Sequence, residues 1–230
     1  MDRFVIIADS TCDLGEEFLR KYDIISLPCH VILPDGRDIP SPEKWTDEER
    51  DAFYTDLKKN PDSYGTSPAN AQEFETAFRK YASEGTPVLA MTISSAISGA
   101  YGFACSAKNA VLADFPGADI RIIDSRRFGP GFGLMAVYAS VMREEGRTIS
   151  ETAGWIEENK NRFHQAGWLD DLSFVAKKGR ITHPKAFFGT LIGIKPLGEN
   201  NRDGMITVIG KAKGEKQAFP AMVEYVKRTI

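Results

Sequence analysis

Three short apolar runs, each followed by small polar residues and then by a helical pattern, constrain this chain most strongly. The runs are rich in Val, Ile, Leu and Ala and cover residues 4–8, 87–93 and 119–124. Such runs are typical of strands that are buried on both faces of a sheet. The helical patterns that follow them cover about 15–22, about 99–112 and a long stretch that ends near residue 145. This alternation predicts right-handed crossovers and a parallel α/β sheet.

Small hydroxyl side chains stand where these strands end. The three segments are Asp9-Ser10-Thr11, Ser94-Ser95 and Asp124-Ser125. In an open parallel sheet the carboxyl ends of the strands form the ligand crevice, and helix N-termini there offer unpaired N–H groups that suit an anion. Taken singly, each serine is expected to cap the following helix. Three such strand ends, together with Thr66-Ser67 in a loop, also predict a shared polar site, so a helix cap and an anion cradle both stay open.

Other chemistries fit the sequence poorly. Ser94 and Ser95 lie in no Gly-x-Ser-x-Gly elbow and have no neighbouring base, which a serine nucleophile needs. The segment Gly129-Pro130-Gly131-Phe132-Gly133 has the wrong glycine spacing for dinucleotide binding and is expected to be a turn. The three cysteines and three histidines are scattered, so we expect no disulfide framework, no metal site, and Cys12 in the core.

The pattern changes near residue 150. Extended patterns at 195–197 and 205–213 flank a turn, and helical patterns cover 150–165, 185–192 and 218–230. We therefore predict an α/β parallel-sheet domain over 1–150 and a smaller α+β second domain over 151–230. A basic cluster at 177–180 is expected to be a solvated loop or, alternatively, a docking or phosphate-facing patch.

Composition excludes several classes of protein. The formal net charge of −3 gives no basic face of the kind that binds nucleic acid. No apolar run is long enough to cross a bilayer, and the first residues lead straight into a strand rather than a signal peptide. We expect a cytoplasmic monomer with no nucleic-acid partner and no stable membrane insertion.

Five segments, in order along nearly the whole chain, resemble the motifs of the DegV family of fatty-acid-binding proteins. They are 8–14 (ADSTCDL), 65–74 with Thr66-Ser67, 93–101 with Ser94-Ser95 and Ser98-Gly99, 123–125 with Asp124-Ser125, and 169–197 with Lys178-Gly179-Arg180-Ile181. The resemblance implies a two-domain α/β fold with the ligand in the cleft between the domains.

The resemblance also implies a ligand and a partner. One long-chain fatty acid would lie in a tunnel between the domains, with its carboxylate held by hydroxyl and backbone N–H groups. The implied ligand-binding residues are Thr66, Ser67, Ser94, Ser95 and Ser98. The protein would be a lipid-binding carrier without cofactor or catalytic residues, and it would present the acid to a fatty acid kinase that forms the acyl phosphate for phospholipid synthesis. Arg180 would contact that kinase or the headgroup.

Two departures from the family pattern affect these expectations. Family members continue with further strands and helices beyond the point where this sequence ends, so we expect the second domain to be incomplete at its C-terminus. Pro68-Ala69 directly follow Thr66-Ser67, where the family places a residue before its proline. The residues themselves also leave two other functions open: a phosphotransferase-like or hydrolase enzyme acting on a small anionic substrate, and a metabolite-binding regulator.

Overall fold

The computed structural model describes residues 4–41, 45–169, 175, 177–182 and 193–229. The chain divides into two compact units, Met1–Phe163 and His164–Ile230. The sequence placed the boundary near residue 150. The units instead divide after Phe163, because helix α6 (Ile149–Asn159) packs against the parallel sheet and helix α5 of the first unit.

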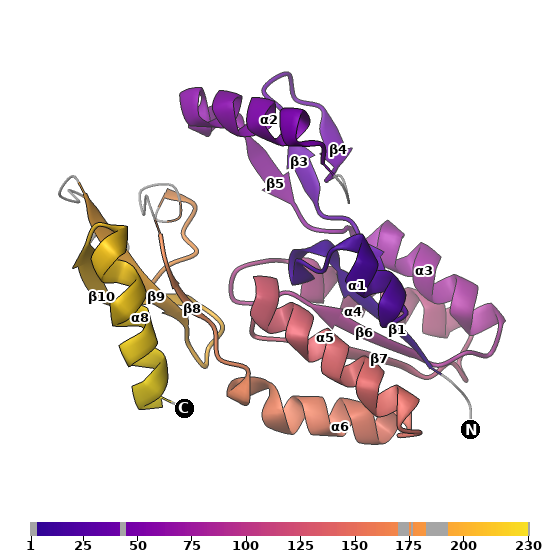
Figure 1. The fold of residues 1–230 in the computed structure, drawn as a ribbon. Helices are drawn as coiled ribbons and strands as arrows, with labels where there is room; N and C mark the ends of the chain where they lie inside the picture. The colour runs from indigo at the N-terminus through magenta and orange to yellow at the C-terminus, as the bar shows by residue number, and fades with distance from the viewer. Residues whose placement is uncertain (1–3, 42–44, 170–174, 176, 183–192, 230) are drawn as a thin grey trace. The chain divides into compact units, whose positions relative to one another are not determined.

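The first unit is built on a four-stranded parallel sheet with the order β2-β1-β6-β7, shown in Figure 1. The strands are β1 (Val5–Asp9), β2 (Ile24–Leu27), β6 (Val88–Thr92) and β7 (Ile120–Asp124). Every residue of β6 is buried, as its continuous apolar run predicts for a central strand. The parallel sheet expected from the sequence is confirmed.

Helices cover both faces of this sheet (Figure 1). Helices α3 (Ala71–Ser83) and α4 (Ala100–Asp114) lie on one face, where Phe74 and Phe78 pack with Val88 and Ala90. The other face carries α1 (Glu16–Lys21), α5 (Gly129–Glu144) and α6, which is followed by the 3₁₀ turn η3 (Lys160–Arg162). Alternate residues of each strand therefore enter two separate hydrophobic cores, which fixes the register of the sheet.

Helix α5 begins earlier than the sequence predicted. The segment Gly129–Gly133 was expected to be a turn, but it forms the first turn of α5 with Pro130 near its start, where a missing N–H costs nothing. Gly133 is needed here because a Cβ atom would lie under 3.0 Å from the carbonyl oxygen of Cys12. The glycines thus allow α5 to pack closely against the 3₁₀ turn η1 (Ser10–Cys12).

A small antiparallel sheet with the order β4-β3-β5 is inserted between β2 and α3. Its strands are β3 (His30–Ile32), β4 (Asp38–Pro40) and β5 (Gly65–Ser67), and the segment also contains α2 (Asp47–Lys59) and the 3₁₀ turn η2 (Pro61–Ser63). Helix α2 starts with a capping box between Thr46 and Glu49. Its Phe53 packs against Trp45 and Tyr64, which ties the helix to the segments on either side of it.

The second unit is a three-stranded antiparallel sheet with the order β10-β9-β8, covered by helix α8. Its elements are β8 (Ala166–Trp168), β9 (Ile194–Asn200), β10 (Ile206–Lys213) and α8 (Glu215–Thr229). Leu197, Ala212, Ala218 and Met222 form its core. The smaller α+β unit expected from the sequence is confirmed, whereas the helix expected at 185–192 lies outside the described residues.

Candidate functional site

The candidate site lies at the carboxyl ends of β1 and β6. The chain passes from β1 outward to β2 and later returns to the other side of β1 as β6, so the direction of the strand order reverses between these two neighbours. In open α/β sheets this switch point is where ligands bind. Asp9 ends β1 and Thr92 ends β6, and both are buried.

Asp9 ties the two strand ends together. Its Oδ2 atom accepts a hydrogen bond from the Ile93 N–H at 2.7 Å, and its Oδ1 atom accepts one from the Thr11 N–H at 3.1 Å. Burial raises the pKa of the Asp9 carboxyl, although the hydrogen bonds from Thr11 and Ile93 act in the opposite direction. Since both carboxylate oxygens already accept hydrogen bonds from the protein, Asp9 holds the β6–α4 loop in place rather than offering a free group to a ligand.

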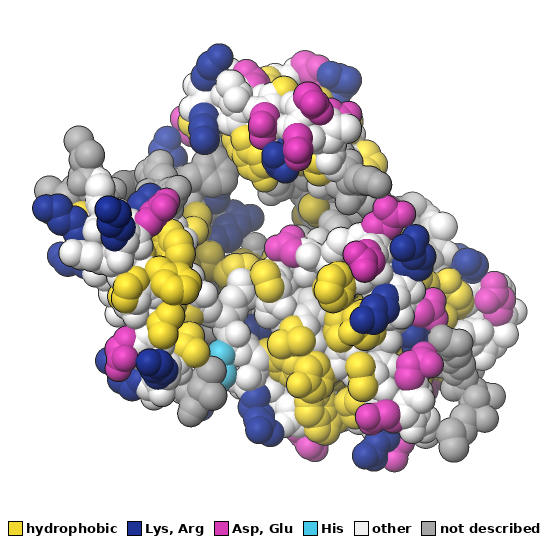
Figure 2. Space-filling model, viewed as in Figure 1, with side chains coloured by type: hydrophobic (Ala, Val, Ile, Leu, Met, Phe, Trp, Pro, Cys, Tyr) yellow, Lys and Arg dark blue, Asp and Glu magenta, His cyan; other side chains and the backbone are white. Residues whose placement is uncertain are grey.

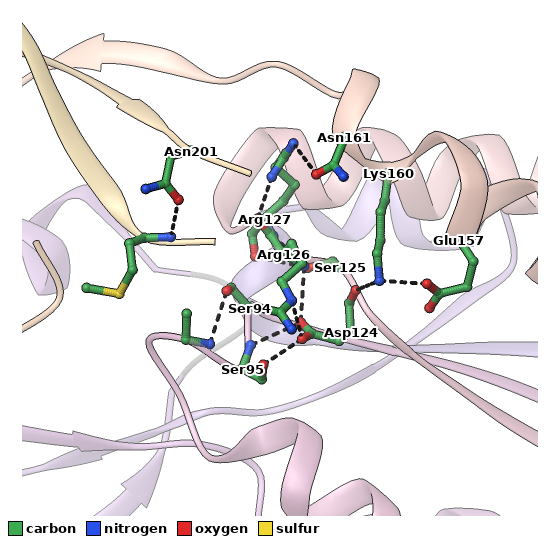
Figure 3. A network of polar contacts seen from close by, with 12 residues as sticks. Ser94, Ser95, Asp124, Ser125, Arg126, Arg127, Glu157, Lys160, Asn161 and Asn201 are labelled. Carbon is green, nitrogen blue, oxygen red and sulfur yellow. Dashed lines mark hydrogen bonds and ion pairs between the residues drawn. The ribbon is translucent and has the colours of Figure 1, made fainter. Parts of the chain in front are cut away.

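Ser94 is the fully buried serine of this loop, and its hydroxyl proton is not committed to an acceptor among the described residues. The residue is fully buried, its N–H donates to the Arg127 carbonyl at 2.9 Å, and its Oγ atom accepts from the Ala96 N–H at 3.2 Å (Figure 3). Within the described part of the chain the Ser94 hydroxyl proton has no acceptor. A buried hydroxyl normally donates its proton, so this group is available to an incoming carboxylate or phosphate oxygen.

Ser95 is bound differently, although it is the next residue. Its N–H donates to Asp124 Oδ1 at 3.0 Å, and its hydroxyl donates to Asp124 Oδ2 at 2.6 Å. The Arg126 Nε atom lies 2.8 Å from the same Oδ2 atom, as Figure 3 shows. The Ser95 proton is therefore committed to a buried carboxylate, and only the lone pairs of its oxygen remain open.

The buried side chain of Arg127 supports the loop. Its side chain is only 2% exposed, and its Nε and Nη1 atoms donate to the carbonyls of Phe163 at 2.6 Å and Arg126 at 2.7 Å. The nearby Lys160 donates to the Asp124 carbonyl at 3.0 Å. Sequence reasoning did not identify Arg127 or Lys160. The one available signal was the pair Arg126-Arg127 directly after Asp124-Ser125 at the end of a buried strand.

The N-terminus of α4 has Gly99 as its cap residue, with no side-chain cap. Ser98 reaches the first turn, since its Oγ atom accepts from the Ala100 N–H at 3.3 Å. The expectation that Ser94 and Ser95 cap this helix is wrong, because their side chains bond to the Ala96 N–H and to Asp124 instead. Of the four first-turn N–H groups, those of Ala100 and Phe103 have acceptors among the described residues, and those of Tyr101 and Gly102 have none there and could bind an anion.

The structure places the other predicted site residues elsewhere in the fold. Thr66 is exposed on β5, and Ser67 of the same strand donates to Asp38 Oδ2 at 3.2 Å. Within the described residues no hydrogen bond joins either of them to Ser94, Ser95 or Ser98. Arg180 belongs to the second unit, where its side chain is exposed and its guanidinium donates to the Lys178 carbonyl.

Reactive thiols and metal ligands are not part of this site as far as the chain is described. Cys12 is buried as expected, and burial raises the pKa of its thiol to about 11, which removes the thiolate at neutral pH. The described residues contain no group of three His, Cys, Asp or Glu side chains that could hold a metal ion. Nor does any described helix have the length and apolarity needed to cross a membrane.

The fold and the strand-end loop together define a class of protein: a parallel α/β unit with a hydroxyl-bearing switch point, followed by a smaller α+β unit. The family model described as uncharacterised protein, DegV family, matches residues 3–230. The chain therefore belongs to the DegV family. A DegV domain-containing protein of Clostridium perfringens is 33% identical over all of this chain and 78% of the relative, and one of Streptococcus pyogenes is 31% identical over 99% and 78%.

Solved structures with the same fold include proteins described by their ligands. A DegV lipid-binding protein of Thermotoga maritima has a TM-score of 0.83 at 28% identity, covering 98% of this chain and 77% of the other. A stearic acid-binding protein of Eubacterium ventriosum has a TM-score of 0.86 at 26% identity, covering 98% and 76%. A fatty-acid-binding DegV protein of Thermus thermophilus has a TM-score of 0.82 at 25% identity, covering 98% and 77%.

Proposed function

We propose that this protein binds a long-chain fatty acid and presents its carboxylate to a fatty acid kinase, without carrying out chemistry itself. The Ser94 hydroxyl and the first-turn N–H groups of α4 bind the carboxylate in this proposal, with Ser98, Thr66 and Ser67 as further contacts. Ser95, whose proton Asp124 holds, fixes the shape of the loop. Arg180 contacts the kinase, which forms the acyl phosphate. The tunnel between the domains that the resemblance implies for the acyl chain stays a prediction.

The observation that carries the proposal is the buried Ser94 hydroxyl with an uncommitted proton at the switch point of the sheet. Fatty acid binding by relatives with TM-scores above 0.8 supports the identity of the ligand. A carboxylate is an acceptor-only group that matches a hydroxyl donor and a helix N-terminus. The site needs no base or metal to perform this role, because binding and orientation are its whole task.

The acyl chain and the carboxylate of the ligand are expected to contribute differently to the binding free energy. Burial of a sixteen-carbon chain at ~0.8 kcal/mol per methylene contributes on the order of 11 kcal/mol before ordering costs. A single hydrogen bond to a charged carboxylate contributes about 1.5–3 kcal/mol. The acyl chain is thus expected to set the affinity, and Ser94 to set the orientation of the headgroup.

Native mass spectrometry of the freshly purified protein tests the ligand. We expect an adduct with the mass of a C14–C18 acid. A protein that is empty and that hydrolyses generic ester or phosphate substrates would contradict the carrier function and would favour an enzyme.

The second test is a pair of serine variants. We expect Ser94→Ala to raise the Kd for a C16–C18 acid by ~10- to 150-fold, since it removes one charge-assisted hydrogen bond. Ser83→Ala, an exposed serine at the end of α3, is the matched control and should leave the Kd unchanged. Equal affinities of Ser94→Ala and the control, measured by isothermal titration, would remove Ser94 from the site.

Acyl-phosphate yield with an added kinase, compared between the parent and Arg180→Ala, tests the partner contact.

A further inference from the structure

His30 on strand β3 lies between two carboxylates from different elements. Its Nδ1 atom is 2.9 Å from Asp38 Oδ1 on β4, and its Nε2 atom is 2.8 Å from Glu73 Oε1 on α3. The His30 side chain is 14% exposed. The imidazole therefore joins the small antiparallel sheet, through both of its ring nitrogens, to a helix that packs on the parallel sheet.

This geometry determines the charge of the imidazole. An ionised carboxylate only accepts hydrogen bonds, and a neutral imidazole has one donor nitrogen and one acceptor nitrogen. Both His30 nitrogens face carboxylate oxygens at hydrogen-bond distance, so both must donate, which only the imidazolium can do. The second oxygen of each carboxylate also accepts a hydrogen bond: Asp38 Oδ2 from the Ser67 hydroxyl at 3.2 Å, and Glu73 Oε2 from the Asn70 N–H at 2.7 Å. Each carboxylate therefore accepts a hydrogen bond at both of its oxygens.

The same contacts reach Thr66 and Ser67. Strand β5 pairs with β3 in the register Ser67 with His30 and Thr66 with Val31, and the Ser67 hydroxyl bonds to the Asp38 side chain that also holds His30. A second anchor lies nearby, where the Cys29 N–H donates to Ser10 Oγ at 2.8 Å. The chain itself joins β5 to α3 through residues 68–70, and the contacts of His30 with Asp38 and Glu73 add a side-chain link that the loss of the His30 charge weakens.

We propose that the His30 imidazolium acts as a pH-sensitive clasp that positions Thr66 and Ser67 for ligand binding by holding strands β3–β5 against α3. The clasp itself follows from the contacts of the protein alone. Its effect on the ligand rests on the proposed function in fatty acid binding.

The direction of the pH dependence follows from the groups that face His30. These are Asp38 from β4 and Glu73 from α3, with the uncharged Ser67 from β5 behind Asp38. Burial lowers the pKa of His30, but the hydrogen bonds and charges of Glu73 and Asp38 outweigh it, so the pKa is raised above 6.5. The stabilisation is fully present below the unfolded pKa of about 6.5 and is lost as the pH rises through the higher folded pKa.

Two measurements on the ligand-free protein test the clasp. NMR titration of the His30 ring, assigned with His30→Gln, should show a pKa above the ordinary histidine value of about 6.5. Amide exchange from pH 6 to pH 9, corrected for intrinsic rates, should show protection of Val31 and Ile32 falling ~10-fold for each unit by which the His30 pKa is raised. Protection of Leu89, Ala90 and Met91 in β6 should stay constant over the same range.

A matched pair of variants separates the clasp from helix capping. Glu73 and Glu151 both occupy the third position of a capping box, which glutamine also supports. We expect Glu73→Gln to lower the His30 pKa and to weaken the pH dependence of β3 protection, with Asp38 still in place, whereas Glu151→Gln changes neither. A His30 pKa no higher than about 6.5, or β3 protection that does not depend on pH, would overturn the clasp.

Fatty acid binding between pH 6 and pH 9 then tests the positioning role. The Kd of the parent should rise with pH. The Kd of Glu73→Gln should be higher than that of the parent and should depend less on pH. A parent Kd that is constant while His30 titrates and β3 loosens overturns positioning but not the proposed function. A protein that binds no fatty acid at any pH refutes the proposed function, and the clasp is then decided by the titration and exchange results alone.

Discussion

Replacing Gly133 with alanine is expected to destabilise the first unit, although alanine is the better helix former. A Cβ atom at this position of α5 would lie under 3.0 Å from the Cys12 carbonyl oxygen and 3.0 and 3.2 Å from Leu14 side-chain carbons. The leucine can move, but the carbonyl oxygen is backbone of η1. Overpacking of this kind costs about 1–3 kcal/mol, against a gain of about 1 kcal/mol in helix propensity. Because a backbone atom is the obstacle, we expect a net loss of ~1–2 kcal/mol.

Urea unfolding, followed by far-UV circular dichroism, measures this loss as a lower midpoint at an unchanged slope. Gly154→Ala is the matched control, since Gly154 lies in helix α6 and an added Cβ would meet no atom within 4 Å. We expect this control to be more stable than the parent by ~0.5–1 kcal/mol. A Gly133→Ala protein that is as stable as the Gly154→Ala protein would refute the close approach of α5 to η1.

Two further predictions concern Asp9 at the end of β1 and Cys12 in the following turn η1. Asp9→Ala should lower the free energy of unfolding by about 1–3 kcal/mol, since the Ile93 N–H loses its acceptor; a denaturation midpoint equal to that of the parent would show that the loop does not depend on Asp9. With a pKa of about 11, Cys12 is about one part in a thousand thiolate at pH 8. Iodoacetamide should therefore label Cys12 last of the three cysteines, which peptide mass spectrometry can follow. Early labelling of Cys12 would contradict its burial.

The sequence predicted the regular part of the fold well, because its signals there are local. Strands β6 and β7 and helix α4 lie within one or two residues of the expected ranges. The predicted start of α5 was wrong for a non-local reason. Gly133 is needed for the close approach of α5 to the backbone of Cys12, which lies over a hundred residues earlier in the chain. The compact units divide later than expected, because the apolar face of α6 is visible in its sequence but the sheet on which it packs is not.

The candidate site shows the same division between local and tertiary information. The sequence placed Ser94, Ser95 and Ser98 in one loop, but it could not distinguish them. Their roles differ because Asp124, from a different strand, takes the proton of Ser95 and leaves that of Ser94. The support of the loop by Arg127 depends on a carbonyl at Phe163, which no motif could indicate.

The strand order also has a consequence for how the chain folds. Strand β1 pairs with β2 across about 18 residues (Ile6 with Ile24), but with β6 across about 83 residues (Val5 with Val88). The longer closure costs only about 1.3 kcal/mol more in chain entropy, at roughly 0.6 kcal/mol per doubling. The β1–α1–β2 unit, whose two strands are parallel, is therefore expected to form first, with β6 joining later. Contacts of Cys29 with Ser10 and of His30 with Glu73 then hold the start of the segment that lies between β2 and α3.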